Sequence, residues 1–266
     1  MSALLYERIY QAIMEPDPAR KCALSGQLVK DWGSQRLQRL DDGCIEAIEI
    51  PGRPSRPQLV HARQVPKRSL ATEQGRQVLL HSFAHIEFNA INLALDAAYR
   101  FRQMPDAYVT DWLQVAAEEA SHFSLIAEYL TELSSSYGAF EAHNGLWDMV
   151  CKTRHDVLHR MALVPRVMEA RGLDVTPGMM DKFAQIGDQR SVAILQIIYQ
   201  EEIGHVAIGN RWYHYCCQQR GLEPKKTFRQ LVDDYFPGKL RGPFNWPARL
   251  AAGFEEDELA ELENYL

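Results

Sequence analysis

The sequence predicts an all-α protein built around a four-helix bundle. Two observations carry this prediction. Apolar residues recur every three or four positions over long stretches, and a Glu-x-x-His unit occurs in two of these stretches, at Glu119–His122 and at Glu202–His205. A Glu and a His three positions apart lie on one helix face. Each unit can therefore present a carboxylate and an imidazole to the same metal ion.

Four long helices follow from the periodicity. They are expected over about residues 71–102, 106–134, 146–171 and 189–219. On the second helix, seven residues at steps of three and four share one face: Trp112, Val115, Glu119, His122, Ile126, Leu130 and Leu133. Two of them are polar on an otherwise apolar face, which is typical of a functional core.

The third helix is the least regular of the four. Pro165 predicts a kink or a restart inside it, and Gly172 is a candidate C-cap. Residues 177–186 are then expected to form a separate short helix, capped by the preceding segment from Asp174. With these boundaries the third helix ends soon after Glu169.

Further segments flank the bundle on both sides. Short helices are expected at residues 3–14, 19–40 and 227–235 and at the acidic C-terminus, with an extended piece at 45–50 and irregular Pro-rich chain at 51–66 and 237–247. The chain is therefore expected to divide into an N-terminal extension (1–68), the bundle (69–221) and a C-terminal extension (222–266), all in one structural unit.

The Pro-rich segment and its flank carry five basic residues and no acid: Arg53, Arg56, Arg63, Lys67 and Arg68. One interpretation is a solvated loop that wraps the bundle. The alternative is a guide for an anionic substrate. The sequence leaves both open.

Composition narrows the class of protein. The chain has 266 residues, is 46% hydrophobic and has a net charge of -6, which fits a globular protein and does not indicate a non-specific nucleic-acid binder. The five Cys are odd in number and form no Cys-x-x-Cys pair, so a disulfide framework and a thiolate zinc site are not expected. Without a signal peptide or a long apolar run, we expect a cytoplasmic protein that does not enter a membrane.

Two Glu-x-x-His units would be completed by one carboxylate from each of the other two helices. Glu87, near the middle of the first helix, is the best candidate there. On the third helix the best Glu is Glu169, although His155 and His159 lie nearer the predicted middle. Such a set of carboxylates and imidazoles suits iron or manganese.

Other polar residues near these positions have different interpretations. Glu118 and Glu201 precede the two ligand candidates and are rotated by about 100° from them, so we expect them to face outward or to support the ligands. His81 and His85 lie one turn apart on the first helix. They are expected in the core or beside the ligands, and extra ligation by them stays open.

Four stretches resemble a known family. They are His85-Ile86-Glu87, residues 118–123 (Glu-Glu-Ala-Ser-His-Phe), residues 162–178 and residues 201–206 (Glu-Glu-Ile-Gly-His-Val). They are similar to the signature stretches of a bacterial ferritin-like family known as domain of unknown function 455. The resemblance runs from about residue 70 through the fourth helix and more weakly over most of the chain.

The resemblance implies a ferritin-like four-helix bundle with a dinuclear metal centre, here with additional N-terminal and C-terminal helices. Carried over by position, it implies six ligands: Glu87, Glu119, His122, Glu169, Glu202 and His205. It favours Glu169 over His159 because Glu169 lies inside the matching stretch. The resemblance implies no substrate.

We therefore expect the function to depend on two bound metal ions. Iron is the first choice for these ions and manganese the second. The leading hypothesis is an oxygen- or peroxide-dependent oxidoreductase or hydroxylase acting on a small molecule, as a monomer or a small homo-oligomer. A tRNA-hydroxylase-like enzyme would instead use the basic segment. The alternatives in other classes are a metal-storage protein with ferroxidase activity alone and an interaction module with a decayed site. No residue stands out as a separate acid or base, and no Gly-rich nucleotide-binding loop is present.

Overall fold

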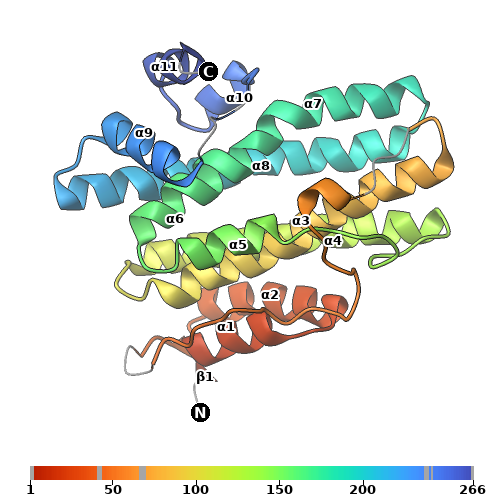
Figure 1. Ribbon diagram of the computed structural model, residues 1–266. Helices are drawn as coiled ribbons and strands as arrows, with labels where there is room; N and C mark the ends of the chain where they lie inside the picture. Colours follow the sequence, from red (N-terminus) through yellow and green to blue (C-terminus); the bar gives the residue numbers. More distant parts are fainter. Residues whose placement is uncertain (1–2, 41–43, 66–69, 237–239, 241, 265–266) are drawn as a thin grey trace. The chain divides into compact units, whose positions relative to one another are not determined.

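The fold is all-α, as predicted, in this computed structural model (Figure 1). The structure describes residues 3–40, 44–65, 70–236, 240 and 242–264. The chain forms two compact units, Met1–Cys151 and Lys152–Leu266. The expected division into an N-terminal extension, a bundle and a C-terminal extension stays a prediction. So does the ferritin-like arrangement, because it would need helices from both units.

The first unit is built on two long helices that lie side by side. Its helices are α1 (Leu5–Met14), α2 (Pro18–Gly33), α3 (Glu73–Arg100), α4 (Asp106–Glu132) and α5 (Gly145–Lys152). α3 packs along α4, with α1 against α3 and α2 against α4 (Figure 1). A 3₁₀ turn spans Ala62–Gln64. Two short strands, β1 (Ala3–Leu4) and β2 (Leu37–Gln38), pair in parallel.

The boundaries of α3 and α4 match their local sequence. The side chain of Thr72 accepts a hydrogen bond from the Gly75 N–H and caps the start of α3. Pro105 immediately precedes α4, where a residue without an N–H costs the helix no bond. On the predicted face of α4, six of the seven residues are fully buried, the exception being Leu133 at the helix end. The prediction of this face is confirmed.

α3 is apolar and long enough to cross a membrane, but 78% of its most apolar window is buried inside the protein. A helix buried in this way is typical of the core of a globular unit. Lys21 of α2 helps to hold it there: its fully buried Nζ donates to the carbonyls of Ala12 and Ile13 at 2.9 and 2.6 Å and to Oδ1 of Asn92 at 2.6 Å. These bonds join the end of α1 to the middle of α3.

The second unit contains α6 (Val157–Leu163), α7 (Ala170–Gln185), α8 (Gln189–Arg220), α9 (Pro224–Tyr235), α10 (Trp246–Ala251) and α11 (Glu256–Asn264). Between α6 and α7 the chain forms a π segment, Val164–Glu169, so the three pieces make one continuous helix. This helix runs beside α8 (Figure 1). The irregularity predicted at Pro165 is confirmed, and it takes the form of this π segment.

The predicted third helix, 146–171, begins within one residue of the prediction but is wrong in its interior and at its end, because it is interrupted after Lys152 and α7 continues to Gln185. It breaks between α5 and α6, where Asp156 caps α6 by accepting a hydrogen bond from the Leu158 N–H at 2.7 Å. Both carboxylate oxygens of Asp156 also receive bonds from Arg220 of α8, each at 2.7 Å. The break is thus fixed by a partner about sixty residues away, which periodicity does not reveal.

The predicted C-cap at Gly172 and the separate helix 177–186 are also wrong, because α7 continues through Pro177. A proline in a helix leaves the carbonyl four residues earlier without its usual donor. Here that carbonyl belongs to Leu173, and Nδ2 of Asn245 donates to it at 3.0 Å. A side chain of the C-terminal segment therefore replaces the missing helix bond.

The C-terminal segment also holds the π segment and α7 through two buried arginines. Arg166 is fully buried, pairs with Glu258 and lies 4.3 and 4.2 Å from the ring centroids of Tyr213 and Phe228. Arg249 donates to both oxygens of Asp174, at 2.9 and 2.8 Å. Buried charges that are paired in this way fix the position of the elements that carry them.

In the segments that flank the bundle, several predicted boundaries and element types differ from the structure. The helix expected over 19–40 ends at Gly33, after which Gln35 adopts a positive φ of 56° and the chain turns into β2. The described residues of 45–50 form no strand. α10 begins inside the stretch expected to be irregular. Pro66, Lys67 and Arg68 of the basic segment lie outside the described residues.

Gly209 of α8 allows the π segment to approach. A Cβ at this position would lie 2.2 Å from Cβ of Pro165, whereas a Cβ at Gly204 on the same helix meets nothing within 4 Å. We expect Gly209→Ala to lower the free energy of unfolding by about 1–3 kcal/mol through overpacking. Gly204→Ala should instead raise it by about 0.5–1 kcal/mol, the usual gain from replacing a helical glycine. Urea denaturation of both variants checks this, and equal gains would contradict the close packing of α8 on Pro165.

Candidate metal centre

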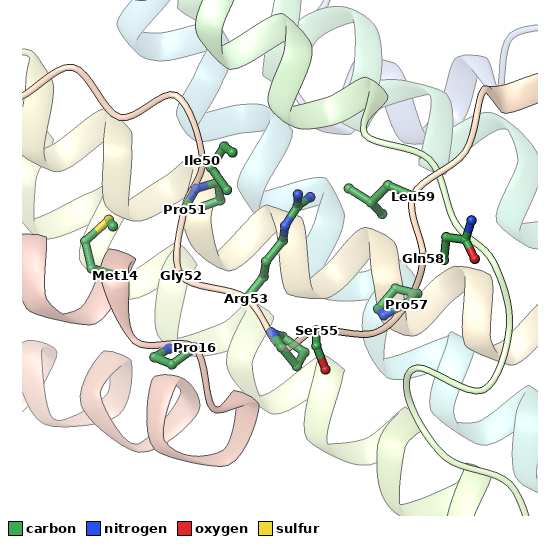
Figure 2. Close-up of a pocket in the computed structure, with 11 residues that line it drawn as sticks. Met14, Pro16, Ile50, Pro51, Gly52, Arg53, Ser55, Pro57, Gln58 and Leu59 are labelled. Carbon is green, nitrogen blue, oxygen red and sulfur yellow. The ribbon is translucent and has the colours of Figure 1, made fainter.

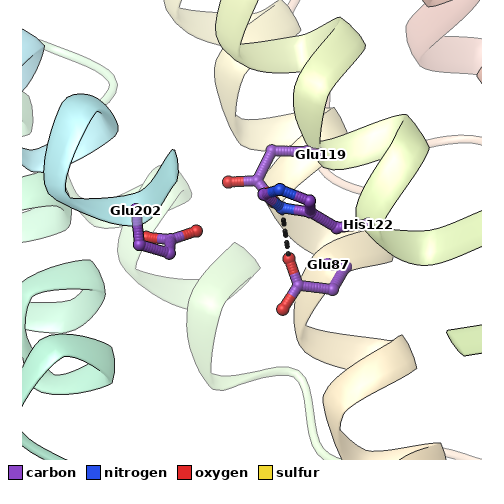
Figure 3. Close-up of side chains that lie close together, drawn as sticks. All are labelled: Glu87, Glu119, His122 and Glu202. Atoms are coloured by element: carbon purple, nitrogen blue, oxygen red, sulfur yellow. Dashed lines mark hydrogen bonds and ion pairs between the residues drawn. The ribbon is translucent and has the colours of Figure 1, made fainter. Parts of the chain in front are cut away.

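Three potential ligands converge in the first unit. Glu87 comes from the middle of α3, and Glu119 and His122 come from the middle of α4. Nδ1 of His122 lies 3.2 Å from Oε2 of Glu119 and 3.4 Å from Oε2 of Glu87. Figure 3 shows the Glu87 carboxylate turned toward the imidazole. The ligand atoms of the three residues lie within 4.8 Å of one another. One imidazole nitrogen thus faces two carboxylates, which we call the first half-site.

Burial and the close approach of these groups shift the pKa values of Glu87 and His122. Burial raises the pKa of Glu87 to about 8, and the nearby charge of Glu119 adds to the rise. Burial alone would lower the pKa of His122, but its hydrogen bonds to Glu119 and Glu87 overcome this and raise it to about 11. The metal-free half-site therefore holds protons that a bound cation would displace.

The second unit carries a similar arrangement on α8. Nδ1 of His205 lies 3.3 Å from Oε1 of Glu202, one turn earlier on the helix. His205 is buried and Glu202 is partly buried. Both Glu-x-x-His units thus adopt the same local geometry, with the imidazole Nδ1 facing the carboxylate three residues before it. We call Glu202 and His205, with Glu169, the second half-site.

Glu169 is the last residue of the π segment and is partly buried. Because α6, the π segment and α7 form one helix over residues 157–185, Glu169 lies close to its middle rather than near its end. Glu87, Glu119 and Glu202 occupy the same central position in their own helices. The position of Glu169 along its helix therefore matches the positions of the other three carboxylates, although its role as a ligand stays a prediction. π segments of this kind are frequent at functional sites.

The neighbouring acids lie on other faces of their helices. Glu118 accepts a hydrogen bond from Gln114 at 2.7 Å on an exposed face of α4. Glu201 is exposed on α8. Both positions agree with the rotation of about 100° that separates adjacent helical residues.

His81 and His85 hold a loop instead of joining the cluster. Nε2 of His81 accepts from the Gly138 N–H at 2.9 Å, and its ring stacks on Tyr137. Nδ1 of His85 lies 2.9 Å from the Tyr137 hydroxyl, and Nε2 lies 3.0 Å from the carbonyl of His143. Burial lowers the pKa of both histidines to about 4, so both are neutral at pH 7.

His155 and His159 also have other partners. Their rings meet edge to face, with centroids 4.9 Å apart, and Nδ1 of His159 lies 3.0 Å from the hydroxyl of Tyr235 on α9. Burial lowers the pKa of His159. These contacts account for His159 without a metal and leave Glu169 as the better candidate on this helix.

Sequence reasoning missed the side chains that support the two half-sites. Tyr137, which contacts both His81 and His85, stands in a Ser- and Gly-rich loop with no periodic pattern around it. Arg166 could have been noticed, since it is a lone cation between the apolar residues Pro165 and Val167. Its partner Glu258 could not, because it lies 92 positions away.

The chemistry of these side chains is suited to a metal ion. Glu87, Glu119 and His122 of the first half-site offer carboxylate and imidazole donors that could hold one, and Glu202 of the second half-site offers a further carboxylate. Such donors accept iron and manganese alike, so the residues do not identify the metal.

Comparison with known proteins agrees with the resemblance noted in the sequence. The family described as "Protein of unknown function (DUF455)" matches residues 14–260. An uncharacterized protein of Haemophilus influenzae is 46% identical over 272 residues, covering 97% of this chain and 94% of that protein. No solved structure gives a significant match. The chain belongs to the DUF455 family.

Proposed function

We propose that the two half-sites together form one dinuclear carboxylate centre inside a ferritin-like bundle of α3, α4, the α6–π–α7 helix and α8. The observation that carries the proposal is the repeated geometry. Each Glu-x-x-His unit aims Nδ1 at its own carboxylate, and each lies beside a helix with a further Glu at its middle. The six ligands would be Glu87, Glu119, His122, Glu169, Glu202 and His205.

The donor set fits two divalent cations. Four carboxylates carry four negative charges, which match the charge of two such ions, and the two imidazoles add neutral donors. The raised pKa of Glu87 supports the fit, because a buried carboxylate that resists ionisation gains most from a nearby cation. Iron is our first assignment and manganese our second.

We infer an oxygen- or peroxide-dependent oxidoreductase that acts on a small molecule. When bound, a pair of iron or manganese ions supplies the redox chemistry. The protein's own side chains would hold the ions, because each imidazole Nδ1 and the carboxylate that it faces are directed at the same position. The rings of Phe88, Phe123 and Tyr137, which adjoin Glu87 and His122 along α3 and α4 or contact those helices, pack together. We place this activity in the cytoplasm.

Metal storage with ferroxidase activity is the alternative from another class. Size-exclusion chromatography separates the two functions, because storage by ferritins depends on assembly into cages of many subunits. We expect a monomer or a small homo-oligomer, consistent with an enzyme. A cage-sized species would favour storage.

The metal content of the purified protein tests the proposed ligands. We expect two equivalents of iron or manganese per chain by elemental analysis, and loss of at least one in Glu119→Gln and in Glu202→Gln, since each removes a charged donor. Glu118→Gln and Glu201→Gln are matched controls one position away and should keep both ions. Full retention in both ligand variants would refute the assignment.

The stability of the metal-free protein offers a second test. The pKa of Glu87 is about 8 in the folded protein against an ordinary value of 4.5, so the folded state keeps a proton that the unfolded chain releases between these values. Wild-type stability should therefore fall as the pH rises from about 5 to 8. We expect Glu87→Gln to reduce this fall, while the part due to His122, whose pKa is also raised in the folded protein, remains above about pH 6.5. The variant should raise the free energy of unfolding at pH 8 by on the order of 1–3 kcal/mol.

Urea denaturation of chelator-treated protein at pH 5 and pH 8 measures this effect, with Glu118→Gln as the control. After metal loading the order should reverse, because Glu87→Gln loses the stabilisation that metal binding gives to the wild type. A variant less stable than the wild type under all of these conditions would show that Glu87 has a purely structural role.

A further inference from the structure

A cavity of about 570 Å³ lies in the first unit, between the end of α1 and residues 50–59 of the Pro-rich segment (Figure 2). Its walls are mainly apolar and include Met14, Ile50, Leu59 and several prolines. The metal-centre proposal does not use this cavity. Its size is within the range of small-molecule sites.

Arg53 is the one charged side chain among the described residues that line the cavity. Figure 2 shows its side chain extending between Ile50 and Leu59. No carboxylate is among the described residues that line the cavity. A planar cation set among apolar walls is suited to an organic anion, since the guanidinium can donate two parallel hydrogen bonds to a carboxylate or phosphate.

The backbone fixes the segment at both ends of the cavity. The Gly52 N–H donates to the Ile13 carbonyl at 2.9 Å, and a Cβ at position 52 would lie 2.2 Å from the Met14 carbonyl, so only glycine fits there. At the other end, Val60 and Gln58 exchange backbone bonds with Ala142, at 2.9 and 3.1 Å. A segment fixed in this way loses little conformational entropy when a ligand binds.

A loop that only wraps the bundle would not explain the apolar surface that this segment exposes. Ile50 is 61% exposed and Met14 is 38% exposed, and both line the cavity. An apolar ligand body lying against them would bury this surface. Arg56 provides the contrast: it belongs to the same basic segment and is exposed like Arg53, but it does not line the cavity.

We propose that this cavity binds an organic anion with an apolar body, held at its charged end by Arg53 and along its length by Met14, Ile50 and Leu59. That the anion is the substrate of the oxidoreductase rests on the proposed function. Its binding does not, because every residue that lines the cavity is separate from the six assigned ligands.

Isothermal titration of the chelator-treated full-length protein tests the proposal, with octanoate, octyl phosphate, octanamide and acetate as probes. We expect at least one of the two long-chain anions to bind, with a Kd on the order of 1 mM or lower. Octanamide should bind about tenfold more weakly for want of a charge. Acetate should bind more weakly still, since each buried methylene strengthens binding by about fourfold.

Two variants distinguish a specific contact with Arg53 from a general attraction of the anion to positive charge. Arg53→Gln should weaken binding of the anion about tenfold and leave octanamide unchanged. Arg56→Gln should leave both affinities unchanged. The proposal is overturned if neither long-chain anion binds, if octanamide binds as well as the anions, or if both variants weaken binding equally. Since these titrations contain no metal, loss of binding here and loss of metal in the ligand variants are distinguishable failures.

Discussion

The approach of two buried carboxylates to one imidazole is the constraint on which the rest of the first unit depends. Glu87 and Glu119 both face Nδ1 of His122, and burial raises the pKa of Glu87 far above its usual range. Such a cluster costs free energy in the metal-free protein. Other contacts must therefore hold α3 and α4 together, and the apolar face of α4, the Lys21 bonds and the aromatic rings around Tyr137 do so.

The second unit is subject to a different constraint: Glu169 lies near the middle of a helix whose geometry is irregular. The π segment carries Glu169, and Gly209 of α8 gives it room. The C-terminal segment stabilises the irregular region from outside: Glu258 pairs with Arg166, and Asn245 binds the carbonyl that Pro177 leaves without a donor. We regard this segment as the support of the second half-site.

Local sequence was sufficient to predict α3, α4 and α8 because each is a long run without an internal proline and with ordinary ends. It was also sufficient to place Glu87, Glu119 and Glu202 near the centres of these helices. It failed on the third helix, where Pro165 and Pro177 suggest breaks that the fold does not make. The donor that carries the helix past Pro177 is Asn245, 72 positions from the carbonyl it binds, and no local pattern contains it. The side chains around His81 and His85 were missed for the same reason.

The central claim is that the two half-sites share one pair of metal ions. Anomalous X-ray diffraction from crystals of the iron-loaded protein, recorded at the iron absorption edge, tests it most directly. We predict two peaks about 3.5–4 Å apart, the spacing of dinuclear centres, with ligands from both half-sites. Peaks confined to one half-site, or one isolated peak in each unit, would contradict the account.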